Sequence, residues 1–184
     1  MKVLYTDFYQ KWFKSLKDPI AKASIAKRLN RITVDDHLGD YKSVGDEVYE
    51  MRIFIKSGIR LYFIFDGDKI IILLCGGDKD NKGYSQSQRN FKGVKMTKLK
   101  EFDVADFLDD DATRQEYLKQ ILEDGNPDEI AQAFLDVARS YGFENISKKT
   151  NLDPDKFYDL FKPKSHFDDL LKVIKAFNLK IACA

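Results

Sequence analysis

The chain has 184 residues, of which 43% are apolar and 33% charged, and this content can build the core of one large domain or of two small ones. No apolar run approaches the roughly 20 residues that span a bilayer, and the first residues lack the long apolar stretch of a signal peptide, so we expect a cytoplasmic protein without membrane contacts. The net charge of +1 is unevenly divided, since residues 1–95 carry 18 Lys and Arg against 12 Asp and Glu, whereas residues 96–184 carry 13 against 18.

The first predicted elements are a short strand and a helix. The residues MKVLYT predict the strand. In the segment that follows, Phe8, Trp12 and Leu16 recur every four residues. This spacing predicts a helix with the three side chains on its apolar face.

A second helix is predicted to begin at Pro19, because Asp18 is a typical N-cap and proline is a typical first helical residue. Its apolar residues have helical spacing and are Ile25, Leu29 and Ile32. Its basic residues predict either a solvated face or a surface that contacts phosphates, and they are Lys22, Lys27, Arg28 and Arg31.

After the loop DDHLGD the apolar period changes to two, which is typical of strands. One face of VYEMRIFI carries Tyr49, Met51, Ile53 and Ile55, and one face of IRLYFIF carries Ile59, Leu61, Phe63 and Phe65. A three-residue loop, 56–58, with Gly58 at positive φ would keep both apolar sets on one side of the sheet. The same register would put Arg52, Arg60 and Tyr62 together on the opposite face.

The third strand, KIIILLC, is apolar without alternation, so we expect it to be central and covered on both sides. The glycine pair after Cys75 is expected to let the chain leave this crowded position. Cys75 and Cys183 lie far apart and without neighbouring histidines, so we expect two small buried residues, with no metal site and no cofactor. The predicted fold class of this half is α+β, with two helices packed on one face of a small antiparallel sheet.

A lysine-rich stretch around Met96 separates this half from one that is almost entirely helical. We therefore expect a domain over residues 1–93, a linker or junction over 94–100, and an all-α domain over 101–184. Gly125 and Gly142 end two predicted helices, the second of which begins with Asn126 as N-cap. Three short helical segments follow, and the turn at Asn151 between the first two has the outline of a helix-turn-helix. Its small core would be built from Ile146, Leu152, Phe157 and Phe161.

The segment VGDEVYEMRIFIKSGIRLYFIFDGDKIIILLCGGDKDNKG resembles the core of the RelE/ParE superfamily of bacterial toxins. It is similar to the small HigB-like "addiction module killer" group, whose members share runs of the form V-G-x-x-V-x-E-x-R-I, G-x-R-x-Y-F and L-L-x-G-G-D-K. The resemblance covers nearly all of residues 1–92. Residues 96–184 resemble the partner antitoxin, the HigA-like "addiction module antidote" group, in the runs FDVADFLDD, GNPDEIAQAFLDVAR and NLDPDKFYDLF and in the later FDDLLKVIKAFNLKI.

The resemblance implies a toxin that cuts messenger RNA, usually in the ribosomal decoding site. Cleavage by the RNA 2′-hydroxyl requires removal of its proton and neutralisation of the phosphorane charge, and planar arginines match phosphate oxygens. Arg52 and Arg60 are the candidate phosphate contacts, and Lys79 is a third cation. Tyr62 is a candidate for stacking on a base or donating a hydrogen bond, and Glu50 is either a base or the partner that orients Arg52. Each of these side chains also has a structural interpretation, as an ion pair, a core residue or a solvated turn lysine.

The resemblance also implies an antitoxin that binds the toxin and represses its own operon as a dimer on a palindromic site. The candidate DNA contacts are Lys156, Tyr158, Lys162, Lys164 and Ser165. The expected recognition helix departs from a typical DNA reader, because it carries Pro154, Asp155 and Asp159 where Arg, Asn or Gln would be favoured.

Two other functions remain open at this point. A ParE-like gyrase inhibitor would share the toxin fold, and a DNA-binding regulator could keep an inactive toxin-like half as an interaction module. The halves could be a natural fusion, an engineered fusion or two chains joined at Met96. Because their charges are opposite, we expect the acidic residues FDVADFLDDDATRQEYLKQIL to pack on the basic half and block its groove.

Overall fold

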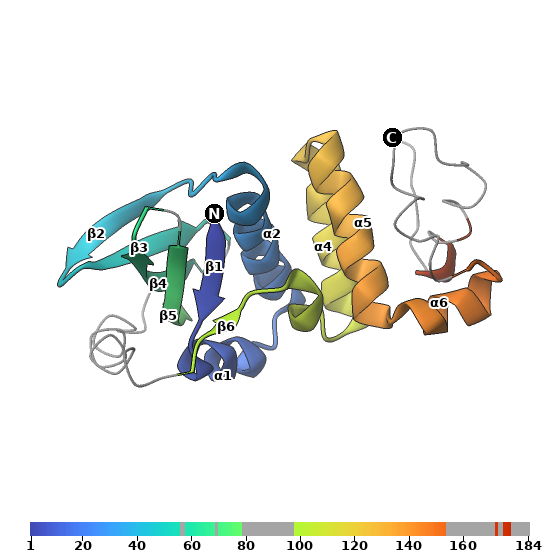
Figure 1. The fold of residues 1–184 in the computed structure, drawn as a ribbon, viewed down its shortest axis with the longest axis horizontal. Helices are drawn as coiled ribbons and strands as arrows, with labels where there is room; N and C mark the ends of the chain where they lie inside the picture. Colours follow the sequence, from blue (N-terminus) through green and yellow to red (C-terminus); the bar gives the residue numbers. More distant parts are fainter. Residues whose placement is uncertain (56–57, 69, 79–97, 154–171, 173–174, 178–184) are drawn as a thin grey trace. The chain divides into compact units, whose positions relative to one another are not determined.

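The computed structural model describes residues 1–55, 58–68, 70–78, 98–153, 172 and 175–177 (Figure 1). The chain divides into two compact units, Met1–Val104 and Ala105–Ala184, which we name the first and second units. Within the described ranges, the structure contains no helix that is both long and apolar enough to cross a membrane.

The first unit is built on a six-stranded sheet with the strand order β2-β3-β4-β5-β1-β6. The strands are β1 (Lys2–Tyr5), β2 (Tyr41–Gly45), β3 (Val48–Ile53), β4 (Ile59–Asp66), β5 (Ile70–Asp78) and β6 (Lys100–Glu101). All neighbouring pairs are antiparallel except β1 and β5, which are parallel. The expectation of a wholly antiparallel sheet was therefore wrong at β1. A four-residue strand has no pattern that reveals its direction, which is set by the two helices that follow it.

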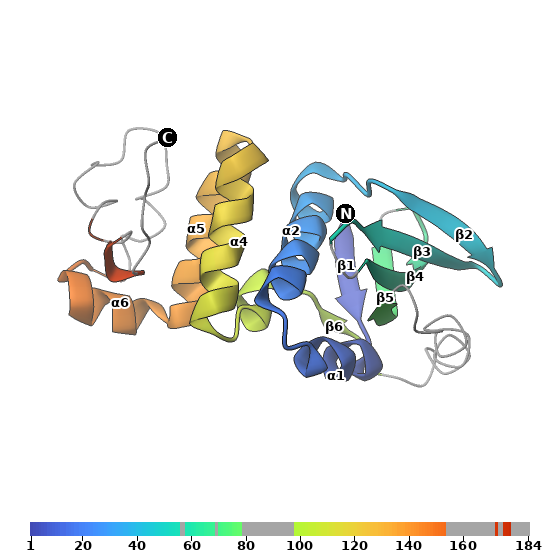
Figure 2. The ribbon, with the colours of Figure 1, turned by 180° about the vertical axis from the view of Figure 1, so that it is seen from behind.

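Helices α1 (Asp7–Ser15) and α2 (Pro19–Asp35) contact the sheet at β5 and at β1 and β3, respectively (Figure 2). The prediction for α2 is confirmed, because the side chain of Asp18 accepts a hydrogen bond from the Ile20 amide and Pro19 is the first helical residue. The apolar residues predicted for this helix, Ile25, Leu29 and Ile32, are all fully buried. Lys22 is buried, so it belongs neither to a solvated face nor to a phosphate-contacting surface, the two alternatives predicted for the basic residues of this helix.

The first helix buries a different face from the one its spacing predicted. Tyr9 and Phe13 are buried, whereas Phe8 is exposed and Trp12 is half-buried. Aromatic residues occupy two adjacent faces of this helix, so a period of four fits both sets equally well. Only the packing against the sheet selects Tyr9 and Phe13.

The hairpin of β2 and β3 was absent from the sequence prediction. Asp46 and Glu47 form its turn, with φ of 51° and 60°. A bulge lies in β2 between Ser43 and Gly45, where the register of its pairing with β3 shifts. Two successive positive φ values suit the right-handed twist of a two-residue hairpin. The strand YKSVG is an exposed edge with one half-buried residue, which is why it lacks an alternating apolar signal.

The register of β3 and β4 pairs Glu50 with Tyr62 and Arg52 with Arg60. It differs by two residues from the register that a three-residue loop would give, so the connection is longer than predicted. A shift of two keeps every side chain on its predicted face. Gly58 has φ of 65°, as predicted.

Strand β5 lies between β4 and β1, and its residues 71–75 are buried, which confirms a central, doubly covered strand. The expectation that the glycine pair ends this strand was wrong, because Gly76 and Gly77 pair with Leu61 and Arg60 in the sheet. A Cβ atom at Gly76 would collide with the ring of Trp12. Gly76 is therefore the residue that lets α1 approach β5.

Strand β6 extends the first unit beyond the junction placed at 94–100. It pairs with β1, and the Phe102 amide donates a 2.9 Å hydrogen bond to the Val3 carbonyl. Phe102 and Val104 are both buried. The boundary between the two units accordingly falls at Val104 and Ala105.

The described part of the second unit is helical and comprises η2 (Val104–Phe107), a 3₁₀ turn that starts at the boundary, followed by α4 (Asp111–Asp124), α5 (Pro127–Tyr141) and α6 (Phe143–Thr150). The predicted ends at Gly125 and Gly142 are confirmed. Asn126 and Glu129 form a reciprocal capping box at the start of α5. Of the predicted helix-turn-helix core, Ile146 is buried and Leu152 is half-buried, whereas Phe157 and Phe161 lie outside the described residues.

Candidate functional site

The candidate site is centred on one buried carboxylate, that of Glu50 in β3. Its Oε2 accepts a hydrogen bond of 3.3 Å from the Tyr62 hydroxyl, and its Oε1 accepts one of 3.2 Å from the Arg52 Nε. Lys42 Nζ and Arg60 Nε each lie 3.8 Å from a Glu50 oxygen. The Glu50 side chain is only 7% exposed, so it is enclosed by these four neighbours. Its contacts are those of a residue that positions cations.

Arg52 and Arg60 lie directly opposite each other on β3 and β4, on the shared face that the sequence predicted. Their side chains are 37% and 31% exposed, so both guanidinium groups remain accessible to a ligand. Arg52 is fixed by Glu50 and also lies 3.8 Å from the carboxylate of Asp40. Two fixed arginines on adjacent strands form a surface that can hold one phosphate between them.

Tyr62 belongs to the core as well as to the site. The residue is 3% exposed and packs with Val48, Ile64 and Ile72 in an apolar cluster. The candidate role of stacking on a base therefore does not fit the structure, whereas donation of a hydrogen bond does. Burial, followed by the neighbouring charge of Glu50, raises the pKa of the Tyr62 hydroxyl, so it stays protonated.

Two further residues belong to this surface and were missed by sequence reasoning. Lys42 and Asp40 lie on and just before β2, the strand that gave no sequence signal. With Arg52, Arg60 and Glu50 they give the site three cations and two anions, so its formal charge is +1. Phe54, which follows the last residue of β3, is 80% exposed, so its ring is accessible for stacking.

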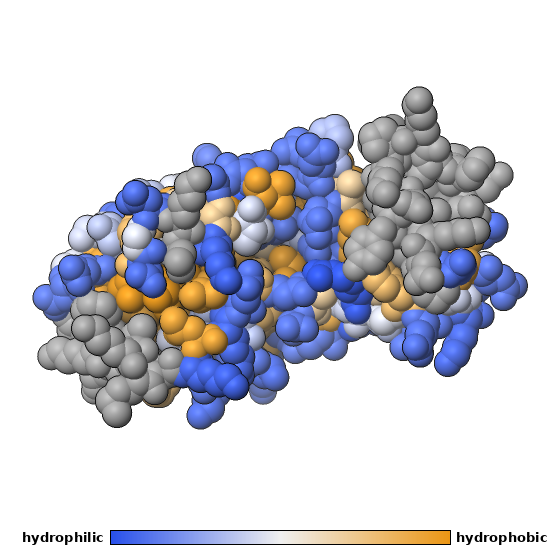
Figure 3. Space-filling model, viewed as in Figure 1, coloured by the Kyte–Doolittle hydropathy of each residue, from blue (hydrophilic) through white to orange (hydrophobic). Residues whose placement is uncertain are grey.

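Apolar side chains adjoin the charged site on the sheet. The cluster that contains Tyr62 also includes Leu74 and Cys75, and the half-buried Leu4, Val44 and Leu99 pack against it. Figure 3 shows apolar side chains gathered over the strands of the first unit, with hydrophilic residues around them. A charged and an apolar surface thus lie side by side within the first unit.

Cys75 pairs with Tyr62 in the sheet but is no candidate nucleophile, because burial raises the pKa of its thiol to about 12.

In a Cys183→Ser variant at pH 8, Cys75 should react with a disulfide reagent about 1,000-fold more slowly in the folded than in the denatured chain. Because the pKa of the Cys75 thiol is higher in the folded than in the unfolded chain, the folded state holds this proton more tightly. The free energy of unfolding is therefore unaffected by this group at neutral pH and falls as the pH rises from about 9 to about 12. Equal reaction rates in the folded and denatured chains would contradict the burial of this thiol.

Lys79 and the five candidate DNA contacts, Lys156, Tyr158, Lys162, Lys164 and Ser165, lie outside the described residues, as does His166. His37 is exposed in the loop before β2. Across the described ranges, no group of three or more potential metal ligands lies close together.

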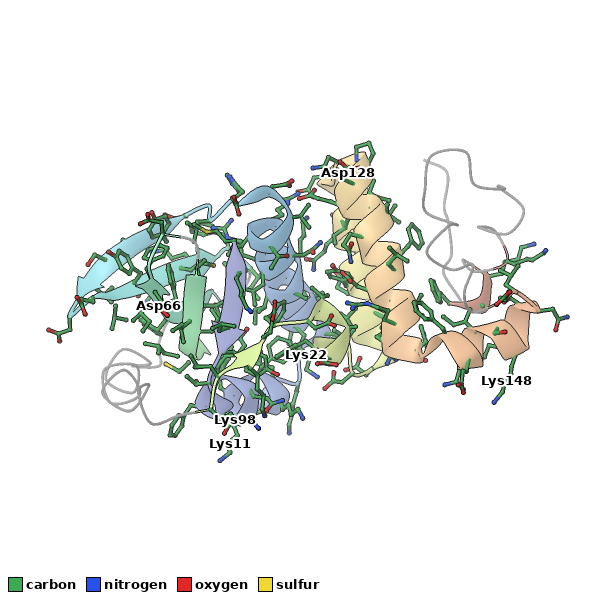
Figure 4. The ribbon with its side chains drawn as sticks, viewed as in Figure 1. Lys11, Lys22, Asp66, Lys98, Asp128 and Lys148 are labelled. Atoms are coloured by element: carbon green, nitrogen blue, oxygen red, sulfur yellow. The ribbon has the colours of Figure 1, made fainter. Side chains whose placement is uncertain are left out.

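The described helices of the second unit are joined by a polar network. Asp136 of α5 is buried and accepts hydrogen bonds from Tyr117 of α4 and from Gln132 and Arg139. Lys148 projects from the last turn of α6 (Figure 4). Asn151 takes the left-handed conformation that ends this helix. A helix followed by a turn is thus described as far as Asp153.

Comparison with known proteins assigns a family to each half. Residues 11–92 match the family described as "Phage derived protein Gp49-like (DUF891)". Residues 98–184 match the family described as "Probable addiction module antidote protein". A Haemophilus influenzae (strain Rd) protein named "Uncharacterized protein" is 36% identical over 91 residues, which are 50% of this chain and 83% of that protein. The chain belongs to the toxin–antitoxin addiction modules.

A second Haemophilus influenzae protein with the same name is 32% identical over 84 residues, which are 45% of this chain and 87% of that protein. No solved structure gives a significant match. In this addiction module the Gp49-like match contains the whole Glu50 site, because β2 to β5 fall within it. The antidote match begins at residue 98, before β6, although β6 pairs in the sheet of the first unit.

Proposed function

We propose that the first unit is a HigB-like messenger RNA endoribonuclease of the RelE/ParE type, and that the second unit is its HigA-like antitoxin. The observation that carries the proposal is the pair Arg52 and Arg60, which face each other on adjacent strands, are oriented by the buried Glu50 and remain accessible. Such a pair suits a phosphodiester whose charge increases in the transition state.

The proposed reaction is attack of the RNA 2′-hydroxyl on the adjacent phosphate, which would form a 2′,3′-cyclic phosphate and break the bond to the 5′-oxygen of the next nucleotide. The 2′-hydroxyl proton would pass to water, and water would protonate the leaving 5′-oxygen. Arg52 and Arg60 would neutralise the phosphorane, and Lys42 would add a third positive charge. Glu50 would act by holding these cations, because its two oxygens are occupied by Arg52 and Tyr62. Phe54 offers a ring on which an unpaired base could stack.

Dependence on the ribosome is part of the proposal. The described site contains cations and a buried carboxylate but no histidine, so it offers positioning and charge stabilisation rather than strong proton transfer. The ribosome would present a single-stranded codon in a fixed geometry. Comparing cleavage of naked and translated messenger RNA tests this part separately.

Neutralisation would occur within the chain. The first unit carries 20 Lys and Arg against 14 Asp and Glu, and the second carries 11 against 16, so the two attract each other. A covalent link also keeps the antitoxin at a high effective concentration, in the millimolar range for short flexible linkers. The intact chain should therefore be silent.

The test is expression of residues 1–104 beside the full chain in cells, with growth and mapped RNA 5′-ends as readouts. We expect growth arrest and new RNA ends with residues 1–104 only. The fragment ends at 104 because a shorter one would lack β6 and the buried Phe102 and Val104. A soluble, folded fragment that leaves both growth and RNA unchanged would rule out the toxin function. DNA damage without RNA cleavage would instead identify a gyrase inhibitor.

We also propose that the second unit represses its own operon as a dimer on palindromic DNA. The support is the described turn after α6, with Lys148 and Lys149 in its last helical turn. Loss of operator binding on adding salt, with a steep dependence on ionic strength, would be expected of phosphate contacts. A gel-shift assay on the DNA upstream of the gene tests this role independently of the toxin.

A further inference from the structure

Strand β6 belongs to one half by sequence and to the other by structure. The antidote family matches residues 98–184, whereas the compact first unit ends at Val104. Residues 98–104, which we name the anchor segment, are thus the first residues of the antidote match and part of the toxin-like fold. Figure 1 shows β6 running beside β1 before the chain continues into the helices.

The anchor segment makes backbone contacts along the edge of β1. Lys100 pairs with Tyr5 and Glu101 pairs with Leu4 in antiparallel register. The Phe102 amide donates to the Val3 carbonyl at 2.9 Å. In an antiparallel ladder the hydrogen-bonded residues alternate, so the Lys100 amide also faces β1 and the Glu101 amide faces away from it.

Side chains of the anchor segment add contacts on several sides. Lys100 Nζ lies 3.1 Å from Asp7 and donates a 3.0 Å hydrogen bond to Gln10, both on α1. Glu101 pairs with Lys2 at 2.9 Å. These ion pairs are partly exposed and contribute little alone, but they fix the register of the strand.

Apolar contacts provide the larger part of the attachment. Phe102 and Val104 are buried, and Leu99 packs against the cluster that contains Tyr62. An exposed strand edge with adjoining apolar surface is the arrangement that recruits an added strand from a partner. Without the anchor segment, β1 would present such an edge.

We propose that the anchor segment is the attachment point of the antitoxin on the toxin, and that it binds by adding a strand to β1. The inference rests on the proposed division into toxin and antitoxin, but it concerns binding and does not require RNA cleavage. In the strand order, β5 separates β1 from β4, which carries Arg60. The anchor segment therefore tethers the antitoxin beside the site without occupying it, and residues that follow it must provide the occlusion.

The test uses the full chain with a protease site introduced between Gly93 and Met96, so that cleavage separates residues 1–93 from the antidote match. After cleavage, both pieces should stay together in size-exclusion chromatography. Lys100→Pro and Phe102→Pro each remove an amide that faces β1, and we expect dissociation constants raised about 10- to 100-fold. Glu101→Pro is the matched control, because its amide faces away from β1, and it should stay close to the unsubstituted chain.

Phe102→Ala provides a second variant that keeps the backbone intact, and loss of its buried ring should weaken association about 10- to 100-fold. Pieces that separate at once without any substitution, or that stay together equally in all variants, would overturn the proposal. Equal weakening by Glu101→Pro would show that strand pairing is not the cause and would also overturn it. RNA cleavage measured on the same samples distinguishes the two hypotheses, because an associated pair is expected to be silent in any case. Variant pieces that dissociate but cut no RNA would support the anchor and reject the endoribonuclease.

Discussion

Arg52→Ala and Arg60→Ala should each reduce RNA cleavage by residues 1–104 about 100- to 1,000-fold. Each guanidinium would contact charge that develops on the phosphate only in the transition state, and removing one such fixed donor typically has an effect of this size. Both side chains are accessible, and they lie near different oxygens of the Glu50 carboxylate. The loss should fall mainly on the cleavage rate at saturating RNA rather than on RNA binding. Single-turnover cleavage of a translated message measures both.

Conservative and distant substitutions make this result interpretable. Arg52→Lys keeps the charge but loses the planar fork, so an intermediate loss is expected. Lys11→Ala is the matched control, because Lys11 is an exposed lysine of α1 on the helical side of the unit (Figure 4). The melting temperature of each variant must stay near that of the unsubstituted fragment. If folded Arg52→Ala and Arg60→Ala proteins cleave at the original rate, the arginines are structural and the proposed site is wrong.

Gly76→Ala should lower the free energy of unfolding of the first unit by about 3 kcal/mol, the upper part of the usual range for overpacking. The added Cβ atom would lie inside the van der Waals radius of the Trp12 ring. That ring cannot rotate away easily, since it packs against Tyr9 at 5.6 Å and Phe13 at 6.5 Å between ring centroids. Denaturant unfolding followed by circular dichroism measures the loss.

A double-mutant cycle separates the collision from other causes. In a Trp12→Ala background the obstacle is gone, so Gly76→Ala should destabilise the unit by much less than in the original chain. Backbone strain does not contribute, because Gly76 is not among the residues with positive φ. Gly67, with φ of 65° and no atom near its added Cβ, provides the contrasting case in which an alanine meets strain without collision. Equal losses at Gly76 with and without Trp12 would contradict the steric explanation.

The sequence alone determined the elements whose signals are local. Asp18 and Asn126 are N-caps with proline after them, and both helices begin there. Alternation in β3 and β4 placed Arg52, Arg60 and Tyr62 on one face, and this survived a shift in register because the shift was even. The uninterrupted apolar run of β5 predicted a central strand. These features depend on periodicity and capping, which residues a few positions apart specify.

Only the tertiary structure decided what distant segments do to one another. The ring of Trp12 leaves no room for a Cβ atom at Gly76, although 64 positions of chain separate the two residues. No local pattern predicts that a glycine inside a strand makes room for an aromatic ring. Lys42 joined the site because the polar β2 pairs with β3. The ring of Tyr62 left the surface because an apolar cluster encloses it. Strand β6 belongs to the first unit, although it follows the junction expected at residues 94–100. The unpaired backbone groups at the edge of β1 pair with residues almost 100 positions later in the chain.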